Sequence, residues 1–200
     1  MQYKHKKYIS VDVESTGKTP GKYSMLSLGA CVVGDIDNQF YRELKPINDN
    51  FDPGAMEIGC LGLDCIKDKG DIYNPKNTNF SPKKVLELLK QEGEEPWKAM
   101  DDFRHWAIDV TMGYKPIIAA APIIFDGMFI AYYFDNFSIY ENPFGHSGED
   151  MNSMYRGKQK DINVSMKELN LRPKELPHNA LEDAIIQAKE FESVLKGIKQ

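Results

Sequence analysis

The chain has few cysteines, no excess of positive charge and no long hydrophobic run, and each absence argues against a class of protein. Its longest apolar stretch, residues 117–125, is interrupted by Pro122 and is much shorter than the roughly 20 residues that a membrane-spanning helix needs. The three cysteines are odd in number and no secretory segment is recognisable ahead of them, so we expect reduced thiols and a cytoplasmic protein. Cys60 and Cys65 have no histidine nearby, which argues against a structural zinc site.

The sequence also lacks internal repeats and low-complexity tracts, and its 200 residues suit a single domain, residues 1–200. Its formal net charge is −5. Proteins that bind long duplex DNA through many phosphates are usually basic, because Lys and Arg release counterions from the phosphates. Any nucleic-acid partner is therefore expected to have a small footprint, such as a single-stranded end or a short oligomer.

The hydrophobic pattern predicts an α/β fold with a mixed central sheet flanked by helices. Three strands joined by short connections favour an antiparallel meander, and one strand that is apolar on both faces favours parallel neighbours. The predicted strands are residues 7–14, 25–33, 40–47 and 115–121, with a turn at 35–38 and a further strand within 157–165. The predicted helices are residues 82–91, 96–113, 125–137, 150–155 and 179–196, and residues 48–80 are expected to form a long loop or short turns.

Two carboxylates lie two residues apart in the first predicted strand. Because side chains alternate along a strand, Asp12 and Glu14 share one face, about 6.5–7 Å apart. Two unpaired carboxylates on one face repel each other, and divalent cations remove that conflict. The pair predicts a metal site, and a solvated strand end is the alternative.

Two later segments add acidic groups and a histidine. Asp126 follows the buried strand, a common position for a functional carboxylate in α/β sheets, although it could simply cap the next helix. Asn179 is a good N-cap with Glu182 three residues on, so the last helix is expected to start there. This leaves His178 on the loop before the helix and Asp183 in the first turn, which suits a proton acceptor beside a metal ligand.

Taken together and in this order, these segments resemble the DEDD superfamily of 3′–5′ exonucleases, in the branch whose last motif carries histidine (DEDDh). That branch includes proofreading exonuclease domains, ribonuclease T and oligoribonuclease. Residues 12–17 (Asp-Val-Glu-Ser-Thr-Gly) look like the first family motif, Phe125-Asp126-x-x-Phe129 like the second, and His178-x-x-x-x-Asp183 like the third. Residues 28–30 (Leu-Gly-Ala) also lie where the family's second strand carries a similar Ile-Gly-Ala. The chain departs from the pattern at residues 121–124, Ala-Pro-Ile-Ile, where members often have His-Asn-Ala.

The resemblance implies a ribonuclease H-like fold and a metal-dependent 3′–5′ exonuclease. Asp12, Glu14, Asp126 and Asp183 would hold two Mg²⁺ or Mn²⁺ ions. Glu14 is expected to be a catalytic residue as well as a metal ligand. His178 would take the proton from the attacking water. The implied substrates are single-stranded 3′ ends of DNA or RNA, or short oligonucleotides, and the implied products are nucleoside monophosphates.

The resemblance also suggests substrate contacts. Ser15 and Thr16, which follow the first acidic pair, would touch the terminal nucleotide. Met25 and Leu26 would wedge against the terminal bases, Met56 lies in a family loop that contacts substrate, and Phe129 is a candidate for stacking on a base. For all six, ordinary turn or core roles are the alternative.

Two other functions remain open from the sequence. A catalytically silent nucleic-acid-binding protein would be expected to have lost at least one of the five acid and base positions, and all five are present. A phosphoesterase acting on small nucleotides, or a nuclease cutting internally, would use the same chemistry in a different pocket. The sequence does not separate DNA from RNA, and it leaves a homodimer open.

Overall fold

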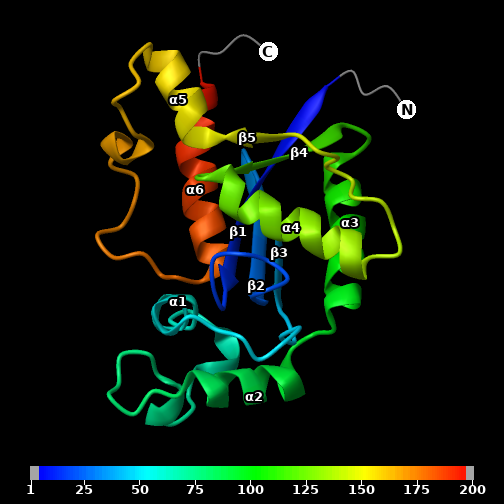
Figure 1. The fold of residues 1–200 in the computed structure, drawn as a ribbon. Helices are drawn as coiled ribbons and strands as arrows, with labels where there is room; N and C mark the ends of the chain where they lie inside the picture. The colour runs from blue at the N-terminus through cyan, green and yellow to red at the C-terminus, as the bar shows by residue number, and fades with distance from the viewer. Residues whose placement is uncertain (1–4, 197–200) are drawn as a thin grey trace.

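A computed structural model describes residues 5–196, and its centre is a five-stranded mixed sheet (Figure 1). The strands are β1 (Lys6–Ser15), β2 (Met25–Val32), β3 (Asp35–Glu43), β4 (Lys115–Ala120) and β5 (Gly148–Asp150), in the order β3-β2-β1-β4-β5. The first three strands pair antiparallel, whereas β4 pairs parallel with both β1 and β5. The predicted α/β class and mixed sheet are confirmed. The predicted domain limits, residues 1–200, include ends that lie outside the described residues.

Two strand predictions were wrong. Residues 35–38 were expected to form a turn, but the chain reverses at Gly34, whose φ of +82° suits a tight hairpin, and β3 begins directly after it. The fifth strand is not within residues 157–165. The first residues of that region belong to helix α5 (Met151–Gln159). The Asp150 side chain caps the start of this helix by accepting from the Ser153 backbone N–H at 2.7 Å.

Helices cover both faces of the sheet, and the alternation of β1 shows which residues face which helices. Ile9, Val11 and Val13 pack into the large core with α3 (Pro96–Thr111) and α4 (Ile123–Phe137). On the opposite face, the Ser10 hydroxyl donates to the Ala184 carbonyl of α6 (Ala180–Leu195) at 2.8 Å. Asp12 and Glu14 share the face of Ser10, so both carboxylates lie on the α6 side of the sheet.

The long connection between β3 and α3 forms a small helical lobe with its own apolar cluster, seen in cyan and green in Figure 1. It contains α1 (Pro53–Gly59), α2 (Pro82–Glu92) and the short 3₁₀ segments η1 (Asp64–Ile66) and η2 (Asp71–Tyr73). A third 3₁₀ segment, η3 (Met166–Leu169), precedes α6. Residues 48–80 therefore hold short helices among turns, and α1 packs against β1 beside its carboxylates.

One glycine fixes how closely α6 approaches the sheet. A Cβ at Gly29 of β2 would lie 2.1 Å from the Ala180 carbonyl carbon, a distance that no side chain tolerates. Gly29 pairs with Asp12 across the β1–β2 ladder. The start of α6 is therefore seated directly beside Asp12, which brings the residues around Asp183 to the carboxylates of β1. Of the helices in the described part of the chain, none is both long and apolar enough to cross a membrane.

Candidate active site

The β1 carboxylates form the floor of the site. Asp12 and Glu14 lie on one face of the strand, and Glu14 is only 9% exposed. The last residue of α1, Gly59, lies against this end of β1, because a Cβ at that position would be 3.2 Å from the Glu14 Oε2 atom. Glu14 is thus enclosed by α1 on one side and by the sheet on the other.

Asp126 joins them from the first turn of α4. Its side chain is almost fully buried, and its Oδ1 atom accepts a hydrogen bond from the Val13 backbone N–H at 2.9 Å. Val13 lies between the two β1 carboxylates in sequence. The bond therefore holds a third carboxylate beside the first two, and it gives Asp126 a function that helix capping alone does not explain.

His178 and Asp183 approach from the start of α6. Asn179 caps this helix as predicted, because its side-chain oxygen accepts from the Leu181 and Glu182 backbone N–H groups at 3.1 and 3.2 Å. Its side-chain amide also donates to the Gly62 carbonyl at 2.7 Å, which ties the turn after α1 to the residue next to His178. His178 itself has a left-handed backbone, with φ of +53°.

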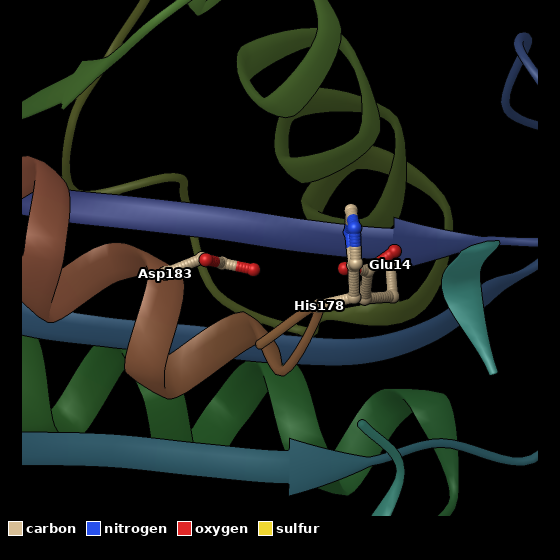
Figure 2. A group of neighbouring side chains, drawn as sticks. All are labelled: Glu14, His178 and Asp183. Atoms are coloured by element: carbon tan, nitrogen blue, oxygen red, sulfur yellow. The ribbon is translucent and has the colours of Figure 1, made fainter. Parts of the chain in front are cut away.

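Glu14, His178 and Asp183 converge closely enough to share one ion. Each offers an atom that lies within 4.8 Å of the corresponding atoms of the other two. Figure 2 shows Asp183 projecting from α6 toward Glu14, with the His178 ring beside the Glu14 carboxylate. The fold thus brings five predicted site residues together: Asp12 and Glu14 from β1, Asp126 from α4, and His178 and Asp183 from the start of α6.

A cavity of about 190 Å³ opens over these groups. It is lined by the four carboxylates and His178, by several apolar side chains, and by one arginine and one glutamine. The lining residues are Asp12, Val13, Glu14, Ala121, Pro122, Phe125, Asp126, Arg172, Leu176, His178, Asp183, Ile186 and Gln187.

Burial and mutual repulsion disfavour the ionised carboxylates. Burial raises the pKa of Asp12 well above its usual range, and the charges of Asp126, Glu14 and Asp183 add to that effect. Burial also raises the pKa of Glu14, with Asp183 and Asp126 contributing. Burial raises the pKa of Asp126 to about 7, although its bond from Val13 opposes the shift, and burial raises the pKa of Asp183. Such a cluster is stable in its charged form only when positive charge is brought to it.

The donor set fits divalent cations that prefer oxygen. Four carboxylates and no thiolate are the ligands expected of Mg²⁺ or Mn²⁺ rather than of softer metals. The Asp183 Oδ1 atom is buried and has no hydrogen-bond partner among the described residues. A buried carboxylate oxygen without a partner is costly, and coordination of a cation would satisfy it.

Sequence reasoning missed two polar residues of the cavity. The Gln187 side chain donates to the Asp12 Oδ1 atom at 2.8 Å, while its oxygen accepts from the Ala121 backbone N–H at 3.0 Å. A signal was available, because Gln187 lies four residues after Asp183 and therefore on the same face of α6. Arg172 had no such signal, since its position depends on an ion pair with Glu190.

The four apolar residues that were predicted to contact substrate are buried in the structure. The side chains of Met25, Leu26, Met56 and Phe129 are all 0% exposed. They fill the two apolar clusters because β2 is covered on both faces and α1 and α4 turn these residues inward. This packing agrees with the alternative of ordinary core residues, and any contact of these four side chains with substrate stays a prediction.

Ser15 and Thr16 are also engaged within the protein. The Ser15 hydroxyl donates to the Gly17 carbonyl at 2.7 Å, and the Thr16 hydroxyl donates to the Asn50 carbonyl at 2.8 Å. Both bonds shape the turn after β1. Any contact of these two residues with a nucleotide stays a prediction.

Comparison with known proteins identifies the family. The model of the family described as the 3′–5′ exoribonuclease Rv2179c-like domain matches residues 7–195. A curated Escherichia coli protein, the 3′–5′ DNA exonuclease Cap18, is 37% identical over 151 residues, which cover 75% of this chain and 68% of that protein.

Solved structures share the fold at low sequence identity. The nuclease domain of 3′hExo, a DEDDh family member bound to rAMP, has a TM-score of 0.66 at 12% identity and covers 98% of this chain and 94% of that chain. E. coli exonuclease I in complex with a dA16 oligonucleotide has a TM-score of 0.59 at 14% identity, over 96% of this chain and 41% of that chain. S. pombe Pop2p, in its Mg²⁺- and Mn²⁺-bound form, has a TM-score of 0.60 at 11% identity, over 95% and 83%. The fold is thus that of ribonuclease H-like DEDDh nucleases, and the chain belongs to the Rv2179c-like family of 3′–5′ exonucleases.

Proposed function

We propose that this exonuclease removes nucleoside monophosphates from single-stranded 3′ ends by metal-dependent hydrolysis, with two divalent ions and His178 as the general base. One observation carries the proposal: Asp12, Glu14, Asp126, Asp183 and His178 border a single cavity although they come from separate parts of the chain. We treat residues 1–200 as one exonuclease domain, since the family model spans residues 7–195.

The four carboxylates are proposed to hold two Mg²⁺ or Mn²⁺ ions, directly or through water. Their raised pKa values and the unpartnered Asp183 oxygen are what a site built for cations would show without them. The related fold of Pop2p was solved with Mg²⁺ and Mn²⁺. When bound, such ions supply Lewis-acid stabilisation of the charge that develops on the phosphate.

His178 is proposed to accept the proton of the attacking water at a ring nitrogen. A His178 ring nitrogen and carboxylate oxygens of Glu14 and Asp183 lie within 4.8 Å of one another, so the proposed base stands next to the proposed metal ligands. The tie from Asn179 to Gly62 holds the preceding backbone in place. A positioned general base of this kind contributes about 10²–10⁴-fold to the rate.

The substrate is proposed to be a single-stranded end or a short oligonucleotide. Exonuclease I was solved with a dA16 oligonucleotide and 3′hExo with rAMP. The family description names an exoribonuclease, whereas Cap18 is named a DNA exonuclease, so both polymers are candidates. A net charge of −5 agrees with a small footprint on the polymer.

The test is a time course with 5′-labelled single-stranded DNA and RNA of matched sequence, each with Mg²⁺, Mn²⁺ or EDTA. We expect a metal-dependent ladder that shortens from the 3′ end in single-nucleotide steps, and the faster polymer identifies the preferred substrate. Asp12→Ala is the control for contaminating nuclease. Cleavage that persists in EDTA, or internal cuts without a 3′ ladder, would contradict the proposal.

A further inference from the structure

A single arginine lines the candidate active-site cavity. Arg172 borders it together with the four carboxylates, and no other arginine or lysine does so in the described part of the chain. Nucleic acid brings a negative charge at every linkage. Within residues 5–196, Arg172 is therefore the one permanently charged cation placed to meet a phosphate inside the cavity.

An ion pair fixes the orientation of this side chain. The Arg172 Nε and Nη2 atoms donate to the two carboxylate oxygens of Glu190, each at 2.7 Å. The Glu190 side chain is 0% exposed, whereas that of Arg172 is 21% exposed. A pair of parallel bonds to a buried partner holds the plane of the guanidinium in place.

The same pair leaves hydrogen-bond donors free. A guanidinium carries five N–H donors, and two serve Glu190. The other three donate to no acceptor within residues 5–196. Arg172 is thus a pre-oriented cation, half in the ion pair and half open to the cavity.

The chemistry of a 3′ end restricts which phosphate Arg172 can meet. The terminal nucleotide ends in a hydroxyl, so every phosphate other than the scissile one lies on the 5′ side, in the strand that is retained. The scissile phosphate belongs at the carboxylates, where cations neutralise it. Arg172 lines the same cavity but is held by Glu190 and is not one of the proposed cation ligands, so its charge is available for the next phosphate.

We infer that Arg172, oriented by Glu190, binds the internucleotide phosphate next to the scissile linkage and so holds the retained strand. The inference rests on the proposed function and adds a subsite to it. It makes the enzyme sensitive to the charge of one particular linkage beyond the bond that is cut.

The competing explanation is that Arg172 only anchors its own segment. Residues 171–177 form no helix or strand, and among their side chains only Arg172 makes a hydrogen bond to another part of the described chain. Since this segment leads into His178, removing the anchor could lower turnover without any phosphate contact. The experiment must therefore change the phosphate as well as the protein.

The test replaces the linkage next to the scissile one by an uncharged methylphosphonate. For the wild-type enzyme we expect kcat/KM to fall about 10- to 100-fold, the range for loss of a charged hydrogen bond. Replacing Arg172 alone would leave Glu190 buried and unpaired, so the variant of choice is Arg172→Gln combined with Glu190→Gln. On the all-phosphate substrate, kcat/KM of this double variant should be lower than that of wild type by a similar factor. Replacing the phosphate by the methylphosphonate should then change its kcat/KM little.

Lys174→Gln is the matched control, because Lys174 is an exposed cation on the same segment and does not line the cavity. It should keep the wild-type response to the methylphosphonate. Loss of one phosphate contact should also reduce the slope of log kcat/KM against log salt concentration by about 0.7 in the double variant. A purely structural anchor would not change that slope.

Two outcomes would overturn the inference. One is a wild-type enzyme that is indifferent to the neutral linkage, a result that requires no folded variant. The other is a double variant that loses turnover but keeps the full response to the methylphosphonate, which would assign Arg172 to anchoring. A wild-type enzyme that fails to cut the all-phosphate strand would instead contradict the proposed function.

Discussion

Asp126→Asn should make the metal-free protein more stable at neutral pH while abolishing its activity. The amide retains an oxygen that can accept from the Val13 N–H, so the tie between α4 and β1 is kept. What the variant removes is a buried negative charge beside two other carboxylates.

The magnitude follows from the pKa of Asp126, which burial raises from 3.8 to about 7. At roughly 1.4 kcal/mol for each pKa unit, the ionised form costs the folded state about 4 kcal/mol above pH 7. Water reaching the cavity reduces this figure, so we expect a gain of about 2 kcal/mol, or 4–8 °C in Tm for a chain of this size.

The sign of the pH dependence follows from the same shift. Because the folded-state pKa lies above the unfolded one, the contribution of Asp126 to stability is complete below about pH 4 and is lost as pH rises through about 7. Asp126→Asn has no carboxyl group at this position to ionise, so its stability does not fall over this pH range for that reason. The difference in Tm between variant and wild type should therefore be near zero at pH 4 and largest at pH 7.5.

The assay is thermal unfolding followed by circular dichroism in EDTA, at pH 4, 5.5 and 7.5. Asp135→Asn is the control, because Asp135 is an exposed carboxylate on the same helix, and its change should stay within about 0.5 kcal/mol at every pH. A variant that is no more stable at pH 7.5, or a gain of equal size at pH 4, would refute the reasoning.

Three further substitutions probe the catalytic groups. Asp12→Ala should abolish cleavage in the ladder assay while unfolding at a temperature equal to or above that of wild type, since it removes a repelling charge; an active variant would rule out a metal-binding function for Asp12. His178→Ala should reduce kcat by about 10²–10⁴-fold with little change in KM, and a change within about twofold at neutral pH would exclude His178 as the base. Gln187→Leu removes the amide that donates to Asp12, so the Mg²⁺ concentration for half-maximal rate should rise about 10- to 100-fold; an unchanged metal requirement would show that this bond does not position Asp12.

The candidate site was predictable wherever its geometry is local. Strand alternation alone places Asp12 and Glu14 on one face, and N-capping alone places His178 before α6 and Asp183 in its first turn. The convergence of these pieces is not local. It depends on Gly29 allowing α6 to reach the sheet, and the resemblance to a known family was needed to anticipate it.

What the sequence did not reveal depends on packing between distant segments or on elements too short to show a pattern. Met25 and Leu26 are adjacent in β2, and alternation would expose one of them, but β2 lies between two strands and under apolar clusters on both faces. Strand β5 has three residues, too few for a periodic signal, so it was not found. The Arg172–Glu190 pair joins residues 18 positions apart through tertiary packing, which no local pattern records.

The central claim is that the four carboxylates hold two divalent ions, and anomalous diffraction from crystals grown with Mn²⁺ tests it most directly. The account predicts two peaks about 3.5–4 Å apart in the cavity lined by Asp12, Glu14, Asp126 and Asp183. The absence of any peak at these carboxylates in crystals soaked at saturating Mn²⁺, or one ion held elsewhere, would contradict it.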